Sequence, residues 1–269
     1  MSTSQVTVKE ETHKGYALTT WELGAGPPLL FLHGAGGAAN MFAGEQPAAF
    51  LVELAKSFRV IVPEHPGFGV KERPDWLDNI HDMAYFYLDY LKGLDLGGVH
   101  VVGQSLGGWI ALEMAVRDTS DIASLTVAGA AGLRLKGIKK EDIFLWTRDD
   151  FVRHMFRNPE VAKAFAAHEP SPDQLKAMLR NNETLALLAW EPRMYDPNLD
   201  KWLHRIDVPT HVIWADDDVV MPRPYGEGIT ALVKGAKFSV VPKTGHLLHL
   251  DEPQAFSQAV QSFIMEQAA

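Results

Sequence analysis

Gly103-Gln104-Ser105-Leu106-Gly107 is the segment from which the architecture of this chain can be predicted. It lies between a β-favouring run at residues 99–102 and a helix-like run at residues 108–116. A strand, a sharp turn that carries a serine and then a helix present a hydroxyl group at the edge of a parallel sheet. The two glycines allow close approach of neighbouring backbone where a Cβ atom would collide. The segment therefore indicates nucleophilic chemistry at Ser105, and a flexible glycine-serine turn is the alternative.

Short apolar runs alternate with helix-period stretches on both sides of this segment. The runs that predict strands are residues 29–32, 59–62, 99–102, 124–127, 211–214 and 238–241. The stretches that predict helices are residues 46–57, 80–92, 106–117, 225–233 and 253–265. The first 23 residues alternate and predict a β-hairpin. Strands that are apolar on both sides belong in a sheet covered on both faces, so the pattern predicts a mostly parallel sheet with right-handed crossovers.

Residues 132–206 interrupt this alternation. They carry helical signals and many large apolar side chains, and they contain no convincing strand. Four prolines divide the segment, which predicts several short helices: Pro170, Pro172, Pro192 and Pro197. We expect a helical cap over residues 132–206 that folds over the carboxyl edge of the sheet. Residues 1–131 and 207–269 then form the core domain.

The composition excludes several function classes. The net charge of -9 argues against nucleic acid and anionic membranes as partners. The chain contains no cysteine, which excludes disulfides, thiolate catalysis and zinc–thiolate sites. The start of the chain lacks the apolar stretch of a secretory signal, so we expect a cytoplasmic protein. We expect a small-molecule substrate as partner, without a metal or organic cofactor, and a homodimer is left open.

A serine hydroxyl group needs a base within hydrogen-bonding reach and an acid that orients the base. His246 follows the last predicted strand, which places it at the same sheet edge as Ser105. His249 is the alternative, although a capping or packing role before the final helix explains it. The run Asp216-Asp217-Asp218 follows the preceding strand. We expect one of these carboxylates to face the histidine and the other two to serve the turn or face solvent.

Catalysis at a carbonyl group also needs two backbone N–H groups that stabilise the oxyanion. Leu106, at the start of a helix, supplies one of these donors in our interpretation. The other comes from the loop at residues 33–37, which is nearly devoid of side chains. We assign it to Ala35, with Gly36 as the alternative. His33 is expected to brace this loop.

Taken together, these motifs resemble those of the α/β-hydrolase family over essentially the whole chain. The segment Trp214 to Pro222 resembles the family pattern W-G-x-D-D-x-x-x-P, in which the aspartate four residues before the proline is the triad acid. This aspartate is Asp218, and the chain order Ser105, Asp218, His246 is that of the family. The resemblance implies an α/β-hydrolase fold: a mostly parallel eight-stranded sheet flanked by helices, with a helical cap insertion.

Our first functional hypothesis is a carboxylesterase-like serine hydrolase. It cleaves a small, apolar or aromatic ester, lactone or thioester through an acyl-enzyme on Ser105. A second set of residues is expected to bind the substrate. They lie in the loop at residues 33–37, next to a triad residue in the sequence, or in the predicted cap: Gly34, Gly36, Trp146, Val219 and Leu247.

Two alternatives stay open. The first is a hydrolase that cleaves a carbon–carbon bond in a diketone or a ring-cleavage product. The loop at residues 33–37 lacks the G-G-G-P-G-A form, and Leu247 rather than a tryptophan follows His246, which weakens this match. The second is a non-catalytic ligand-binding protein, because the fold alone does not establish activity.

Overall fold

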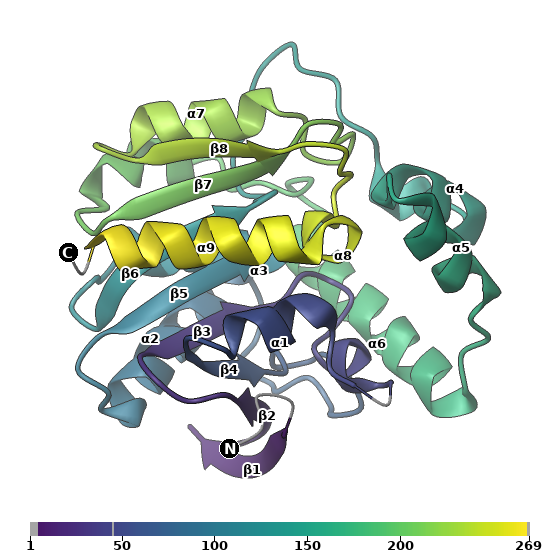
Figure 1. The fold of residues 1–269 in the computed structure, drawn as a ribbon, viewed down its shortest axis with the longest axis horizontal. Coiled ribbons are helices and arrows are strands. Elements are labelled where there is room, and N and C mark those ends of the chain that lie inside the picture. Colours follow the sequence, from purple (N-terminus) through teal and green to yellow (C-terminus); the bar gives the residue numbers. More distant parts are fainter. Residues whose placement is uncertain (1–4, 45, 268–269) are drawn as a thin grey trace.

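The computed structural model describes residues 5–44 and 46–267 and contains one eight-stranded sheet (Figure 1). Its strand order is β1-β2-β4-β3-β5-β6-β7-β8. The pairs β1–β2 and β2–β4 are antiparallel, and the other neighbours are parallel. The strands are β1 (Thr7–His13), β2 (Tyr16–Leu23), β3 (Pro28–Leu32), β4 (Arg59–Pro63), β5 (Val99–Gln104), β6 (Ile122–Ala128), β7 (Thr210–Ala215) and β8 (Lys237–Val241). The predicted hairpin and the mostly parallel sheet are confirmed.

Helices cover both faces of the sheet, and a cluster of buried apolar side chains lies between the sheet and the helices on each face. In Figure 1, α1 (Ala49–Leu54) and α9 (Pro253–Gln267) lie in front of the sheet, beside α8 (Leu248–Asp251). The other face packs against α2 (Ile80–Leu94), α3 (Leu106–Ala115) and α7 (Pro224–Leu232). None of the helices within the described ranges is both long and apolar enough to cross a bilayer.

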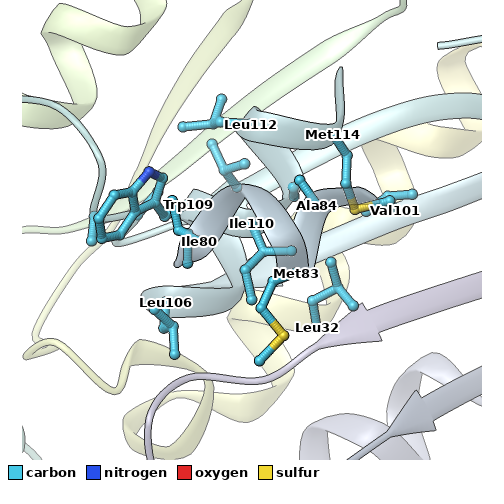
Figure 2. Packing of buried hydrophobic residues seen from close by; sticks show 14 of the residues in the cluster. Leu32, Ile80, Met83, Ala84, Val101, Leu106, Trp109, Ile110, Leu112 and Met114 are labelled. Carbon is cyan, nitrogen blue, oxygen red and sulfur yellow. The ribbon is translucent and has the colours of Figure 1, made fainter. Parts of the chain in front are cut away.

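Helix α3 is buried along its whole length. Figure 2 shows Leu106, Trp109 and other α3 side chains packed near Met83 of α2 and Leu32 of β3. A Cβ atom added at Gly107 would lie 2.0 Å from the carbonyl oxygen of Leu32, so helix and strand approach backbone to backbone. Truncation of a large buried side chain in such a core costs about 2–5 kcal/mol. This packing fixes the start of α3, and with it Ser105, at the edge of the sheet.

The chain between β6 and β7 is helical, as expected. It contains η2 (Ile143–Leu145), α4 (Arg148–Met155), α5 (Pro159–Ala167), α6 (Pro172–Ala189), η3 (Leu199–Lys201) and η4 (Leu203–Arg205). Thr147, Asn158 and Ser171 cap α4, α5 and α6 through side-chain oxygens. Helix α6 is longer than the prolines suggested, because Pro172 lies in its first turn, where proline is tolerated. Figure 1 shows α4, α5 and α6 on one side of the sheet; their assignment as a separate cap domain stays a prediction.

Candidate active site

Ser105 occupies a strained turn between β5 and α3. Its φ of 54° and ψ of -113° lie outside the backbone conformations that residues other than glycine normally adopt. A Cβ atom at Gly103 would lie 2.4 Å from the carbonyl oxygen of Gly107, so both glycines of the motif are required for this approach. The N–H of Ser105 donates to the carbonyl oxygen of Ala128 at 2.9 Å, which ties the turn to β6. The side chain thereby projects from the sheet edge.

The three residues expected to act together do lie together. Nε2 of His246 lies 2.8 Å from Oγ of Ser105, and Nδ1 of His246 lies 2.8 Å from Oδ2 of Asp218. A carboxylate only accepts hydrogen bonds, so we assign the ring proton to Nδ1, which leaves Nε2 free to accept the serine proton. The N–H groups of Val220 and Met221 donate to Oδ1 of Asp218 at 2.9 and 2.8 Å and fix the carboxylate. All three side chains of the candidate triad are buried.

The other two aspartates have their own partners. Asp216 accepts hydrogen bonds from the N–H groups of Lys243 and Thr244, at 2.8 and 3.0 Å. It therefore fastens the loop that carries His246 to the end of β7. Asp217 forms an ion pair with Arg157, which precedes α5. Asp216 therefore stabilises the turn and Asp217 contacts the helical segment, and both side chains are exposed to solvent.

His249, the alternative base, packs in an aromatic environment instead. Its ring centroid lies 4.8 Å from that of Phe50 and 6.0 Å from that of Phe256. Burial, together with the nearby charge of His246, lowers the pKa of His249 to about 3. It is therefore a neutral core residue at physiological pH.

The loop at residues 33–37 lies directly against Ser105. A Cβ atom added at Gly34 would lie 3.3 Å from Cβ of Ser105 and 2.4 Å from Oε1 of Gln104. His33 is fully buried, and its Nδ1 donates to the carbonyl oxygen of Gly34 at 2.6 Å. Its Nε2 accepts a hydrogen bond from the N–H of His65 at 3.0 Å. His33 thus braces the loop, as expected.

Glu64 and Asn181, which the sequence analysis did not select, hold the end of this loop and the two residues that follow it. The carboxylate of Glu64 accepts hydrogen bonds from the N–H groups of Ala38 and Ala39, at 2.7 and 3.0 Å. Asn181, on α6, donates to the carbonyl oxygen of Gly36 at 3.0 Å. Its side-chain oxygen accepts a hydrogen bond from the N–H of Gly69 at 2.7 Å. The buried amide group of Asn181 therefore joins α6 to the loop of Gly36 and to the loop of Gly69.

The proposed oxyanion donors belong to two segments that adjoin Ser105. Leu106 is the first residue of α3, so its N–H lies among the free donors of the helix N-terminus. Ala35 is half-buried, between Gly34 and Gly36. A positive helix end favours developing negative charge. The roles of Ala35 and Leu106 stay predictions.

The remaining predicted substrate contacts adjoin the helical segment. The ring of Trp146 stacks on that of His154 in α4, with centroids 5.1 Å apart. The carbonyl oxygen of Val219 accepts a hydrogen bond from the N–H of Glu141 at 2.9 Å. The N–H of Leu247 donates to the carbonyl oxygen of Met155 at 3.2 Å. Contact of these side chains with a substrate stays a prediction.

Gln104 and Gly129 are further site residues that sequence reasoning missed. The side-chain amide of Gln104 donates to the carbonyl oxygen of His246 at 3.3 Å. A Cβ atom added at Gly129 would lie 3.3 Å from Oδ2 of Asp218 and 3.4 Å from Nδ1 of His246. Gln104 stands at a variable position of the serine motif. For Gly129, the only signal was its place two residues after the strand predicted at residues 124–127.

One group of side chains away from Ser105 has the donor atoms of a metal site. His81, Glu113 and Asp196 offer ligand atoms that lie within 4.8 Å of one another. However, Arg117 pairs with Glu113 at 2.5 Å, and His81 pairs with Asp196 at 2.5 Å. Burial raises the pKa of Glu113, which further weakens it as an anionic ligand. We therefore assign no metal to this group.

Nearly the whole chain is similar in sequence and fold to known proteins. The family model described as the alpha/beta hydrolase family matches residues 29–259. The chain belongs to the alpha/beta hydrolase family. Among its alpha/beta hydrolase relatives is the 2-hydroxy-6-oxo-6-(2'-aminophenyl)hexa-2,4-dienoic acid hydrolase of Metapseudomonas resinovorans, which is 27% identical over 92% of this chain and 87% of that protein. The 2-hydroxymuconate semialdehyde hydrolase of Pseudomonas sp. strain CF600 is 26% identical over 90% of this chain and 88% of that protein.

A solved structure shows the same alpha/beta hydrolase fold. It is that of a serine hydrolase involved in carbazole degradation, with a TM-score of 0.76 and 21% identity. The match covers 97% of this chain and 100% of the other. The fold class expected from the sequence is thereby confirmed.

Proposed function

We propose that this alpha/beta hydrolase is a serine hydrolase that forms an acyl-enzyme on Ser105. The observation that carries the proposal is the chain of two hydrogen bonds, 2.8 Å each, from Ser105 through His246 to Asp218. A base within hydrogen-bonding reach of the hydroxyl group, oriented by a carboxylate, is what this chemistry requires.

The geometry supports a two-step reaction. Oγ of Ser105 attacks the carbonyl carbon while its proton passes to Nε2 of His246, and the oxyanion accepts hydrogen bonds from the N–H groups of Leu106 and Ala35. His246 then gives this proton to the leaving alcohol as the acyl–oxygen bond breaks. In the second step, water takes the place of the serine hydroxyl group, and the acid is released. Asp218 stabilises the imidazolium in both steps, and no cofactor takes part.

We infer a small apolar or aromatic ester, thioester or lactone as the substrate. Apolar side chains adjoin the loop of His246: Met155 and Phe156 are buried, and Leu247 packs against the same core cluster. Phe144 and Trp146 lie at the edge of this cluster. An apolar acyl or aryl group gains roughly 25 cal/mol for each Å² that it buries in such surroundings.

Cleavage of a carbon–carbon bond is the second candidate, and the two relatives favour it. Their names specify a 2-hydroxy-6-oxo dienoic acid and a semialdehyde as substrates. These compounds contain no ester or amide bond, so hydrolysis of their carbon skeleton breaks a carbon–carbon bond. The same triad can serve both reactions, since each passes through attack on a carbonyl carbon.

One set of assays tests both candidates. We expect a fluorophosphonate probe to label wild-type protein and not Ser105→Ala. Wild-type protein is then assayed with p-nitrophenyl esters of increasing acyl length and, separately, with 2-hydroxy-6-oxo dienoates that carry methyl or aryl groups. Ester turnover alone supports the first candidate, and dienoate turnover with slow ester cleavage supports the second. Absence of labelling and of turnover in folded protein would instead indicate a ligand-binding protein.

A further inference from the structure

A buried carboxylate connects the loop of His246 to the helical segment. Asp251, at the end of α8, is 1% exposed. Its Oδ2 accepts hydrogen bonds from the N–H groups of Gly245 and Arg157, at 2.7 and 2.8 Å, and its Oδ1 accepts one from the N–H of Asn158 at 3.1 Å. Gly245 directly precedes the proposed catalytic base. Arg157 and Asn158 belong to residues 155–158, which join α4 to α5 and which we call the junction segment.

The junction segment contacts the other side of His246 as well. Its Met155 accepts a hydrogen bond from the N–H of Leu247 at 3.2 Å. The side-chain amide of Asn158 donates to the carbonyl oxygen of Asp251 at 3.1 Å. A Cβ atom at Gly245 would lie 2.6 Å from the carbonyl oxygen of Met155, so the two backbones are in tight contact. Leu247 is therefore hydrogen-bonded to the junction segment, and Gly245 contacts it directly and is linked to it through Asp251.

A carboxylate in this environment is sensitive to the loss of any donor. A buried charge is stable only when hydrogen bonds replace the water that solvated it. Asp251 obtains its three backbone donors from both the His246 loop and the junction segment. Displacement of the junction segment would remove two of these donors and leave the carboxylate free to move, together with Gly245. The loop of His246 and the junction segment thus share one buried carboxylate.

We propose that Asp251 is a positioning residue, which holds His246 in place for proton transfer by clamping its loop to the junction segment. This inference rests on the proposed function of Ser105 and His246. It implies that the helical segment controls the reactivity of Ser105, even toward reagents too small to need a substrate pocket there. A misplacement of about 1 Å can cost about 100-fold in rate.

The first test is Asp251→Asn in the full-length protein. Asparagine has the same shape, but its amide group offers one acceptor oxygen and places two N–H donors where the carboxylate accepted. The measurements are the rate of Ser105 labelling by a small alkyl fluorophosphonate, and kcat and KM with p-nitrophenyl acetate. We expect labelling and kcat to fall at least about tenfold with little change in KM, since a proton-transfer step is affected rather than binding. The downfield NMR signal of the Nδ1 proton of His246, identified by its absence in His246→Ala, should shift or broaden.

Asn158→Ser and Asn79→Ser form a matched pair for the case that Asp251→Asn does not fold. Both asparagines are N-caps, of α5 and α2 respectively. Serine preserves the capping oxygen at each position. Only Asn158→Ser removes a hydrogen bond to Asp251, so we expect slower labelling for this variant and wild-type labelling for Asn79→Ser.

The outcomes separate the two proposals. If folded Asp251→Asn has a lower Tm but labels at the wild-type rate with an unchanged NMR signal, Asp251 is merely structural and this inference is wrong, while the proposed function stands. If Asp251→Asn does not fold, equal labelling rates of Asn158→Ser and Asn79→Ser likewise show that this inference is wrong, while the proposed function stands. If wild-type protein itself is not labelled, the proposed function fails, and the positioning role fails with it.

Discussion

Nδ1 of His246 lies 2.8 Å from Oδ2 of Asp218, although 28 positions separate the two residues in the sequence. The register of the last two strands explains this contact. β7 and β8 are parallel neighbours, and Ala215 pairs with Val241 at their carboxyl ends. The two loops that follow therefore leave the sheet side by side, and Asp216 fastens one to the other through Lys243 and Thr244. Strand pairing and the contacts of Asp216 therefore bring Asp218 and His246 together.

The carboxylate of Asp218 can be tested without removing its backbone contacts. In Asp218→Asn, Oδ1 can still accept from Val220 and Met221, but an N–H group then faces Nδ1 of His246. The imidazole must move its proton to Nε2 and can no longer accept one from Ser105. Such a change of tautomer lowers kcat by about 10⁴-fold in serine proteases, and we expect a loss of similar order here. Glu227→Gln, which removes an exposed carboxylate paired with Arg223, serves as control for steady-state kinetics. A variant that retains a tenth of the wild-type kcat would exclude Asp218 as the acid.

Gly129 offers a test of how little space the acid–base pair has. Its φ is +54°, and an added Cβ atom would lie 3.3 Å from Oδ2 of Asp218 and 3.4 Å from Nδ1 of His246. We expect Gly129→Ala to lose about 1–2 kcal/mol of stability from the backbone conformation alone. We also expect its kcat to fall, because the methyl group presses on the hydrogen bond between Asp218 and His246.

Gly235→Ala separates these two effects. Gly235 has a φ of +76°, and an added Cβ atom there would meet nothing within 4 Å. Both alanine variants should therefore lose stability in urea unfolding, and only Gly129→Ala should lose activity. Equal kcat values for the two would show that the site tolerates the methyl group.

The sequence predicted those parts of the molecule that depend on local pattern. Apolar runs and helical periodicity predicted the sheet and its covering helices, and the serine motif predicted the sharp turn at Ser105. Selection of Asp218 among three adjacent aspartates needed the resemblance to a family. Asn181 and Asp251 had no comparable signal. They act by hydrogen bonds to segments distant in the sequence, to Gly36 and Gly69 in one case and to Arg157 and Asn158 in the other, and no periodicity marks such contacts.

The buried His249 should make the protein sensitive to acid. Its pKa of about 3 in the folded state lies below the ordinary value of 6.5, so the unfolded chain binds the proton more readily. Stability is therefore fully present above pH 6.5 and falls as the pH decreases toward 3, by up to about 1.4 kcal/mol for each pH unit. His249→Leu removes this contribution and should make the pH dependence of the free energy of unfolding between pH 7 and pH 4.5 less steep, while His65 and His211, whose pKa values burial also lowers, continue to contribute.

Urea unfolding at several pH values measures this difference. His204→Gln is the control, because it also removes a histidine, but one that is exposed. We expect the control to follow the wild-type pH dependence. If His249→Leu loses stability on acidification as steeply as wild-type protein does, His249 is not the source of the acid sensitivity.

Asn181 should influence catalysis through the loop that carries Ala35. In Asn181→Ala, the N–H of Gly69 loses its partner, and the carbonyl oxygen of Gly36 keeps only the hydrogen bond from the side chain of Asn40. A buried polar group left unsatisfied, here the N–H of Gly69, costs about 1–3 kcal/mol. Ala35, the proposed oxyanion donor, directly precedes Gly36, so we expect kcat to fall as well. Loss of a whole oxyanion donor costs about 10²–10³-fold, which sets the upper limit for this variant.

Thr184→Val is the matched control, because Thr184 lies on the same helix but donates to the carbonyl oxygen of Gly67 at 2.5 Å rather than to the loop at residues 33–37. Both variants loosen the contact between α6 and the core, but only Asn181→Ala loosens the loop beside Ser105. We therefore expect both variants to lower the Tm. Only Asn181→Ala should lower kcat, because only this variant weakens the proposed contact between Ala35 and the oxyanion. An equal fall in kcat for both would show that α6 acts on the site as a rigid body. The position of Ala35 would then not depend on the hydrogen bond from Asn181 to Gly36.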